Sequence, residues 1–212
     1  MSELELHRQR ILQGGLTLSD LHPNPFQQLA HWLQQAKDSG IRYPNAISLS
    51  TVDSRGIPYQ RMVMMRQFDE QGLVFFTSLG SRKAEHLATN QNASILLPWH
   101  MLERQVHVVG IVQPLGKLEI IKYFASRTKQ NQLAAWLSDQ PSPVSKRGVL
   151  EAKMSELRAN FGRGEVSLPP FWGGYRLLPE SFEFWQTGTD HINERFIYRQ
   201  SEDGWQLGRF NP

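Results

Sequence analysis

The sequence lacks cysteine altogether: none of its 212 residues is one. This absence excludes disulfide bonds, thiolate metal sites and a cysteine nucleophile. Long apolar runs are absent too, since none reaches the roughly 20 residues that a helix needs to cross a bilayer. The N-terminal residues carry acidic side chains and no apolar stretch of the kind found in signal peptides. We therefore expect a soluble protein of the cytoplasm.

The sequence also has only a small excess of one sign of charge. The 23 Lys and Arg residues only slightly exceed the 20 Asp and Glu residues, which gives a formal net charge of +3 and a sequence pI of about 9.3. The chain has no block of about five like charges, the pattern typical of nucleic-acid-binding tails. We therefore expect no nucleic-acid partner.

The common catalytic and ligand-binding motifs are missing. There is no G-x-G-x-x-G, no G-K-[ST] phosphate loop, no G-x-S-x-G and no H-E-x-x-H in the sequence. The seven His residues are scattered, and no two of them stand at a spacing typical of metal ligands. Neither a metal site nor a Ser–His hydrolase is expected.

Aromatic residues, by contrast, are abundant, with 11 Phe, 6 Trp and 5 Tyr. The length of the chain suits one domain with a substantial core. Residues 1–20, interrupted by Gly14-Gly15, are interpreted as an N-terminal arm. Residues 21–212 are interpreted as a single domain.

The periodicity predicts a mainly antiparallel β protein with peripheral helices. Asn24-Pro25 is typical of a helix start and Gly40 of its end. Strands at 46–52, 59–66 and 73–78 are separated by Asp-x-x-Gly turns, which predict two hairpins in series. Further strands are expected at 93–99, 105–113, 171–178, 182–186, 196–198 and 205–207, and helices at 81–88, 118–126, 132–137 and 150–161. Since regular β–α–β alternation is missing, an antiparallel barrel is favoured over a Rossmann fold.

A candidate anion site lies near residue 80. Arg61 and Arg66 flank an apolar strand and, five positions apart, point to opposite faces. A later strand leaves through a glycine into the helix start Ser81-Arg82-Lys83. Backbone N–H groups, the positive end of the helix dipole and two cationic side chains suit a phosphate monoester. The alternative is that Arg82 and Lys83 simply face solvent.

Three other segments carry groups suited to a flat ring or to a second phosphate. Gln105 opens an apolar strand and could read the edge of a heteroaromatic ring. Tyr123 and Arg127 stand at i and i+4 on one helix face, where they could hold a phosphate. Trp185, followed by a turn and Arg195, could wrap one side of a ring. The alternatives are an ordinary strand-end Gln, a surface Tyr–Arg stack and a core Trp.

Taken in order, these segments resemble the pyridoxine/pyridoxamine 5′-phosphate oxidase family. The shared motifs are R-x-V-x-x-[K/R], S-L-G-S-R-K, P-W-H-x-L-E-R-Q, F-W-G-G-[Y/F] and S-F-E-F-W-Q…R-F. They follow one another along essentially the whole chain. The resemblance implies an FMN-binding split β-barrel, a homodimer with FMN at the subunit interface, and a part in pyridoxine and pyridoxal phosphate biosynthesis.

The resemblance also implies the cofactor contacts. The cationic residues among these contacts suit the FMN phosphate, and the amide and aromatic residues suit the isoalloxazine ring. Carried over position by position, the FMN contacts are Arg61, Met62, Val63, Met64, Met65, Arg66, Phe76, Thr77, Arg82, Lys83, Gln105, Gln140, Trp185 and Arg195. The position after Gln140, usually Ser in the family, is Pro141 here.

Substrate contacts follow in the same way. In the family a Lys, a Tyr, an Arg and a Ser hold the substrate phosphate, and the matching positions here are Arg66, Tyr123, Arg127 and Asn131. At the first of these a planar guanidinium replaces an amine, which is a compact point charge. In the N-terminal arm Arg8 matches the family, whereas the Tyr that helps to cover the site is Ile11.

The clearest departure from the family is its R-L-H triplet, which contacts the pyridine ring and its reacting substituent. Here the triplet reads His191-Ile192-Asn193. Losing the guanidinium could cost several kcal/mol of barrier, and each ~1.4 kcal/mol is a factor of ten in rate. His191 could partly substitute when protonated. We assign His191 and Asn193 as the candidate catalytic residues and as substrate contacts.

Three functional hypotheses follow. The first is FMN-dependent oxidation of pyridoxamine or pyridoxine 5′-phosphate to pyridoxal 5′-phosphate, with oxygen as the acceptor and no metal. The second is a flavoenzyme of the same fold acting on another flat substrate, because the triplet differs. The third is a non-catalytic binder of FMN or pyridoxal phosphate.

Overall fold

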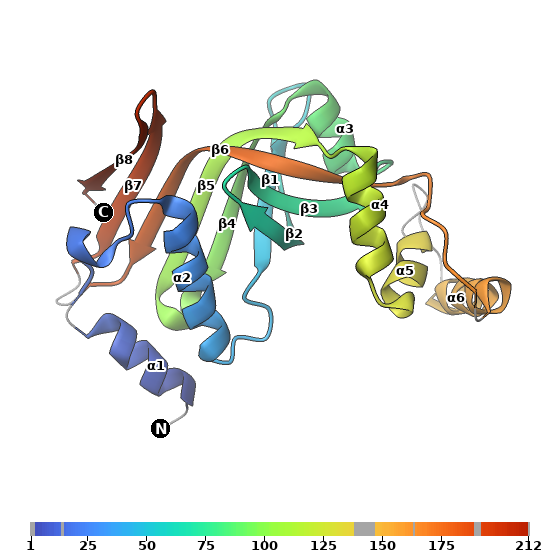
Figure 1. Cartoon of the computed structure of the whole chain (residues 1–212), viewed down its shortest axis with the longest axis horizontal. Coiled ribbons are helices and arrows are strands. Elements are labelled where there is room, and N and C mark those ends of the chain that lie inside the picture. The colour runs from blue at the N-terminus through green and yellow to red at the C-terminus, as the bar shows by residue number, and fades with distance from the viewer. Residues whose placement is uncertain (1–2, 14, 138–146, 163, 189–191, 212) are drawn as a thin grey trace.

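The computed structural model describes residues 3–13, 15–137, 147–162, 164–188 and 192–211. Its centre is an antiparallel sheet in the order β3-β2-β1-β4-β5-β6-β7-β8, in which β3 also pairs with β6 (Figure 1). Strands β1 to β6 therefore close into a barrel, and β7 and β8 extend the sheet beyond β6. The antiparallel barrel with peripheral helices predicted from the sequence is confirmed.

The strands are β1 (Ala46–Val52), β2 (Pro58–Asp69), β3 (Gly72–Ser78), β4 (Asn92–Trp99), β5 (Arg104–Pro114), β6 (Trp172–Gln186), β7 (Glu194–Ser201) and β8 (Gly204–Phe210). The α-helices are α1 (Glu3–Leu12), α2 (Pro25–Asp38), α3 (Arg82–Thr89), α4 (Lys117–Ser126), α5 (Lys129–Trp136) and α6 (Arg147–Phe161). Two short 3-10 helices are η1 (Leu18–Asp20) and η2 (His100–Leu102).

Local turn chemistry sets the first hairpins as predicted. Between β1 and β2, the Asp53 carboxylate accepts hydrogen bonds from the backbone N–H groups of Arg55 and Ile57, both at 2.9 Å. Gly56 follows at φ +83°, a left-handed conformation that favours glycine. The same pattern closes the hairpin between β2 and β3, where Gly72 has φ +141°.

The prediction of two separate strands at 171–178 and 182–186 is wrong. The structure has one long strand, β6, which pairs with β3, β5 and β7. The pairing with β5 shifts register between Val109 and Gly110, opposite Ser181 and Pro179. A proline cannot donate to the ladder, but it is tolerated at such a bulge, so the strand bends there instead of ending.

Helix α2 covers one side of the barrel through its apolar face. Its N-cap Asn24 accepts hydrogen bonds from the N–H groups of Phe26 and Gln27, and Pro25 occupies the first turn, as predicted. Trp32 is almost fully buried and contacts Phe184 edge to face at 5.1 Å between ring centroids. The helix is thereby fixed to β6, the strand that carries the candidate site residue Trp185.

A second, smaller apolar cluster lies at the other end of the molecule. Figure 1 shows α4, α5 and α6 grouped beyond the barrel, on the side away from α1 and α2. Their buried side chains, which include Phe124, Leu133 and Leu157, pack with Trp172, the first residue of β6. Residues from this cluster approach the barrel next to β3.

The N-terminal segment forms α1, which packs against the barrel core through Leu4 and Ile11. Arg8 forms ion pairs with Glu5 and with Glu103, which follows η2. The division into an arm at 1–20 and a domain at 21–212 stays a prediction. No helix in the described part of the chain is both long and apolar enough to cross a membrane.

The close approach of β5 and β6 at the bulge requires a residue without a side chain at position 110, and this requirement can be tested by substituting Gly110. A Cβ atom at this position would lie 2.0 Å from the Leu178 carbonyl oxygen, which is backbone and cannot move aside cheaply. We expect Gly110→Ala to lower the free energy of unfolding by about 1–3 kcal/mol, the usual cost of overpacking. Chemical denaturation measures it.

Gly148→Ala is the matched control, because nothing lies within 4 Å of a Cβ atom there. It should leave the stability unchanged or slightly raised. Equal stability of the two variants would contradict the close packing described at the bulge.

Candidate functional site

Three cationic side chains meet beside the start of α3. Arg61 comes from β2, and Arg82 and Lys83 from the first turn of α3. Burial lowers the pKa of Arg61, and the neighbouring charge of Arg82 lowers this pKa further. Burial likewise lowers the pKa of Lys83, with a further contribution from Arg61. Arg61 therefore lies close enough to Arg82 and to Lys83 for their positive charges to repel its own.

Neutral groups hold the two arginines. The Arg61 Nη1 donates to the Thr51 hydroxyl at 2.7 Å and to the Leu49 carbonyl at 3.1 Å. The Arg82 guanidinium lies over the ring of Tyr59, with Cζ 5.1 Å from the ring centroid. Neither arginine forms an ion pair with a carboxylate in the described part of the chain.

Lys83 is held in the same manner, by two hydroxyl groups. Its Nζ donates to Thr77 Oγ1 at 2.9 Å and to Ser81 Oγ at 3.3 Å. Ser81 occupies the N-cap position of α3, as predicted, but its side chain accepts no backbone hydrogen bond there. Glu85 also stands in the first turn of α3, but no ion pair joins any of the three cations to a carboxylate in the described part of the chain. Three such cations at a helix N-terminus are suited to an anion such as a phosphate. The alternative that Arg82 and Lys83 simply face solvent is wrong for Lys83, which is half-buried, and is confirmed for Arg82, which is exposed.

A second cationic group lies on an aromatic stack next to β3. The rings of Tyr123 and Phe76 are stacked 3.9 Å apart, and Phe76 stacks in turn on Trp172 at 4.9 Å. The Arg127 guanidinium lies over Trp172 at 5.0 Å. Helix α4 ends at Ser126 and Arg127 is its C-cap with an extended backbone, so the prediction that Tyr123 and Arg127 share one helix face is wrong. The alternative of a Tyr–Arg stack is not the arrangement found either, because Arg127 lies over Trp172.

The guanidinium of Arg127 contains a hydrogen-bond donor that is not satisfied. Its Nη1 is buried and has no hydrogen-bond partner in the described structure. Burial lowers the pKa of Arg127, the neighbouring Tyr123 raises it, and Arg66 lowers it again. A buried guanidinium nitrogen that lacks an acceptor is energetically costly, and an anion placed there would satisfy it.

A third group forms a row across β5 and β6 of the barrel and β7 of its extension. In the strand register, Trp185 of β6 lies opposite Gln105 of β5 on one side and opposite Arg195 of β7 on the other. Arg195 pairs with Glu183 at 2.8 Å. Trp185 is half-buried and belongs to neither core cluster, so the alternative of a core Trp is wrong. Amide, indole and guanidinium side chains thus share one face of three adjacent strands.

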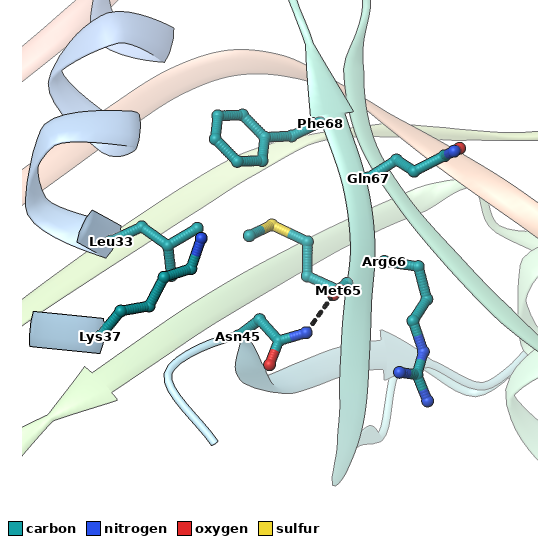
Figure 2. A pocket seen from close by; sticks show the side chains of 7 residues that line it. All are labelled: Leu33, Lys37, Asn45, Met65, Arg66, Gln67 and Phe68. Carbon is teal, nitrogen blue, oxygen red and sulfur yellow. Dashed lines mark hydrogen bonds between the residues drawn. The ribbon is translucent and has the colours of Figure 1, made fainter. Parts of the chain in front are cut away.

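The end of β2 borders a pocket of about 410 Å³ between this strand and α2, lined by Leu33, Lys37, Asn45, Met65, Arg66, Gln67 and Phe68 (Figure 2). The Met65 side chain points toward α2 and is buried, and the Met65 carbonyl accepts a hydrogen bond from Asn45 at 2.8 Å. Figure 2 shows Arg66 on the opposite side of the strand. Arg61 lies opposite the core residue Leu49 in the register. The prediction that Arg61 and Arg66 point to opposite faces is in line with this arrangement.

The remaining candidates are spread more widely. Met62 is exposed, while Val63 and Met64 are half-buried. Asn131 is exposed in the first turn of α5, just beyond Arg127. Asn193 is half-buried immediately before β7.

Two candidates cannot be placed, and one is engaged elsewhere. Gln140 and His191, with the neighbouring Pro141, lie outside the described residues. Arg8 is engaged by Glu5 and Glu103 on the face covered by α1. The structure therefore assembles each of the two cationic groups and the Gln105–Trp185–Arg195 row from separate segments of the sequence. Of the His191-Ile192-Asn193 triplet, it describes only Ile192 and Asn193.

Sequence reasoning missed Trp172, Thr51 and His86. Trp172 supports Arg127, and Thr51 supports Arg61 while also contacting His86 at 3.0 Å. The F-W-G-G motif marked Trp172 as part of the resemblance without giving it a role. Nothing in the local pattern around Thr51 or His86 indicates a contact across 35 positions in the sequence.

The cationic cluster predicts a pH-dependent response to sulfate, an anion whose charge does not change at neutral or alkaline pH. A saturating anion should stabilise the fold, by about 2.7 kcal/mol at 100 times its Kd. Since burial and Arg61 lower the pKa of Lys83, its amine loses charge at a lower pH than an ordinary lysine. We expect the sulfate-induced rise in Tm to shrink as the pH increases in the alkaline range.

In Lys83→Arg the sulfate-induced rise in Tm should persist to a higher pH than in the parent protein, because a guanidinium stays charged. Lys83→Met reports the general effect of sulfate on folded proteins. A rise in Lys83→Met as large as in the parent protein would contradict an anion site at Lys83.

Comparisons with known proteins agree on one family. Residues 33–161 match the family model described as pyridoxamine 5′-phosphate oxidase. Residues 172–212 match the model described as the pyridoxine 5′-phosphate oxidase C-terminal dimerisation region. The pyridoxine/pyridoxamine 5′-phosphate oxidase of Pectobacterium atrosepticum is 49% identical over 97% of this chain and 90% of its own length. That of Shewanella frigidimarina is 48% identical over 100% of both chains.

Solved structures support the same fold. PhzG from Burkholderia lata, solved with tetrahydrophenazine-1-carboxylic acid, has a TM-score of 0.86 at 29% identity, and the match covers 94% of this chain and 98% of PhzG. An FMN-binding protein from Nostoc punctiforme shares the fold with a TM-score of 0.71 at 18% identity, over 87% of this chain and 95% of its own. The predicted split barrel is thereby confirmed. The chain belongs to the pyridoxine/pyridoxamine 5′-phosphate oxidase family.

Proposed function

We propose that this protein oxidises pyridoxamine or pyridoxine 5′-phosphate to pyridoxal 5′-phosphate, with FMN as cofactor and oxygen as electron acceptor. The observation that carries the proposal is the presence of two separate cationic groups, each without a carboxylate partner among the described residues. One contains Arg61, Arg82 and Lys83, and the other Arg66 and Arg127. The reaction needs two phosphate sites, one for the cofactor and one for the substrate. The relatives at 48–49% identity carry the name of this activity.

The first group is assigned to the FMN phosphate. Its members are held by neutral hydroxyl, carbonyl and aromatic groups, so their charge is available to a dianion. The isoalloxazine ring is assigned to the row of Gln105, Trp185 and Arg195. An amide can pair with the polar edge of such a ring, and an indole can pack against it. The other family positions, Met62, Val63, Met64, Met65, Phe76, Thr77 and Gln140, complete the proposed cofactor contacts.

The second group is assigned to the substrate phosphate. The unpartnered Arg127 Nη1 would donate to a phosphate oxygen, and Arg66 would add a second positive charge. Tyr123 and Asn131 are the remaining proposed contacts, since a phenol and an amide can both donate. Arg8 joins this set only when it leaves its ion pair with Glu103.

FMN bound here would supply the redox chemistry: it would take a hydride, which is two electrons and one proton, from C4′ while the substrate hydroxyl or amine loses a second proton, and oxygen would take up the two electrons and two protons as hydrogen peroxide. With the amine substrate, water would then hydrolyse the resulting imine to the aldehyde and ammonia. The chain's own groups contribute placement and electrostatics. The Arg66–Arg127 group fixes the phosphate end of the substrate, so that its pyridine ring can lie against the flavin. His191 and Asn193 are proposed to hold the ring and the C4′ substituent. Of these two residues only Asn193 lies in the described part of the chain, and its side-chain amide can both donate and accept a hydrogen bond.

We further propose a homodimer with FMN at the subunit interface, acting in the cytoplasm. The dimer is supported by the match of residues 172–212 to a dimerisation region. Met62 of β2 supports an interface close to the cationic cluster, since 59% of this apolar residue is exposed one position from Arg61.

A second candidate function is oxidation of another flat substrate on the same scaffold. It is favoured by His191-Ile192-Asn193, which replaces the R-L-H triplet of the family, and by PhzG, whose structure contains a tetrahydrophenazine. Ile192, with 60% of its surface exposed, presents an apolar group where the family has Leu.

The test is formation of pyridoxal 5′-phosphate by the purified holoprotein in oxygenated buffer. We expect turnover of at least one of the two substrates. Anaerobic mixing should bleach the flavin absorbance. No product from either substrate would refute the proposal. Bleaching by another flat substrate alone would support the second candidate, and tight binding without any bleaching would support a non-catalytic binder.

Arg127→Met should raise KM for the phosphorylated substrates by about 30- to 100-fold, because a charged hydrogen bond contributes about 2–3 kcal/mol. Its affinity for FMN should stay unchanged. Lys122→Met is the control, since it removes an exposed charge from α4, the helix that Arg127 caps at its C-terminal end. An unchanged KM in Arg127→Met would contradict the assignment of the substrate phosphate.

A further inference from the structure

A buried histidine lies directly behind the cationic cluster. His86, on α3, is only 5% exposed, and its Nδ1 lies 3.0 Å from the hydroxyl of Thr51. Thr51, on β1, is completely buried. The same hydroxyl accepts the 2.7 Å hydrogen bond from Arg61. His86, Thr51 and Arg61 therefore form a continuous hydrogen-bonded chain that ends at the candidate anion site.

The donors and acceptors available in these three side chains determine the direction of each hydrogen bond. A guanidinium can only donate, so the Thr51 oxygen accepts from Arg61. The single hydroxyl hydrogen of Thr51 is then available for His86, whose Nδ1 must accept it. This hydrogen-bond pattern assigns the tautomer of His86 in which the ring hydrogen is on Nε2. If Nδ1 carried a hydrogen, the buried hydroxyl would lose its acceptor, which is unfavourable.

His86 also supports the second arginine of the cluster. The ring of Tyr59, on β2, contacts the imidazole edge to face at 5.0 Å between centroids. Arg82 lies over that same Tyr59 ring. Of the titratable groups near His86, Tyr59 of β2 contacts the imidazole directly and Arg61 of β2 is linked to it through Thr51. Its own helix α3 also carries Arg82, Lys83 and Glu85. No carboxylate of the described residues forms an ion pair with His86.

Such support is needed because the cluster is electrostatically unfavourable without an anion. Arg61 lies near Arg82 and Lys83 and is partly removed from water. A flexible guanidinium in this position would gain by rotating away from the other two charges. An anchor on the barrel side, opposite the anion, holds it in place before the ligand arrives, which reduces the cost of binding.

We propose that His86 and Thr51 are positioning residues that orient Arg61 toward the phosphate of the bound cofactor. Neither residue touches the cofactor in this account. Their effect passes through the Arg61 guanidinium and is specific to ligands that carry the phosphate. The inference rests on the proposed function in one respect, that the anion held by Arg61 is the phosphate of FMN.

The experiment compares FMN with riboflavin, which has the same ring system and no phosphate. Protein stripped of flavin is titrated with each, and quenching of flavin fluorescence gives the Kd. We expect His86→Leu and Thr51→Val each to weaken FMN binding by about tenfold, the scale of one hydrogen bond. Riboflavin binding should not change. His86→Gln should restore FMN binding, because its amide oxygen can accept from Thr51, and Thr51→Ser should behave like the parent protein.

His31→Leu, which removes an exposed histidine from α2, is the control for the loss of an imidazole. FMN binding as tight as that of the parent protein in both His86→Leu and Thr51→Val would overturn the inference. So would an equal loss of FMN and riboflavin binding, or a His86→Gln variant as weak as His86→Leu.

If the parent protein bound neither flavin, the proposed function would fail on its own. The sulfate-induced rise in Tm of the same variants then decides the positioning role. A smaller rise in His86→Leu and Thr51→Val than in the parent protein and in His86→Gln supports that role, and an equal rise in all of them overturns it.

Discussion

The repulsion of Arg61 by the charges of Arg82 and Lys83 is the constraint on which the site depends. Like charges of this kind are normally paired with carboxylates or dispersed in solvent. Here they are held by a threonine hydroxyl, a tyrosine ring and two further hydroxyl groups, all of them neutral. The arrangement leaves the positive charge uncompensated, which is unfavourable for the fold and favourable for binding a phosphate.

The barrel makes this arrangement possible because its strands bring distant segments together. Pairing of β1 with β2 sets Thr51 and Leu49 within reach of Arg61. Pairing of β3 with β6 closes the barrel and stacks Phe76 on Trp172, which in turn supports Arg127. Both cationic groups are thereby tied to rigid strands, and an anchored side chain has less freedom to lose when a ligand binds.

Features governed by local chemistry could be predicted from the sequence. Asn24 and Pro25 gave the start of α2, and the Asp-x-x-Gly turns gave the first hairpins. The helix start at Ser81 and the cations next to it also followed from short-range pattern. The continuity of β6 did not, since Pro179 is typical of a strand end unless its partner strand offers a bulge. Nor did the contact of His86 with Thr51, which exists only because α3 packs on β1.

A crystal structure of the protein with FMN bound would show directly where the cofactor phosphate lies. We predict the FMN phosphate within hydrogen-bonding distance of Arg61, Arg82 and Lys83, with the hydrogen bonds from Arg61 to Thr51 and from Thr51 to His86 intact and the ring system against Gln105 and Trp185. A phosphate bound elsewhere, with the three cations turned toward solvent or paired with carboxylates of the partner subunit, would contradict this prediction.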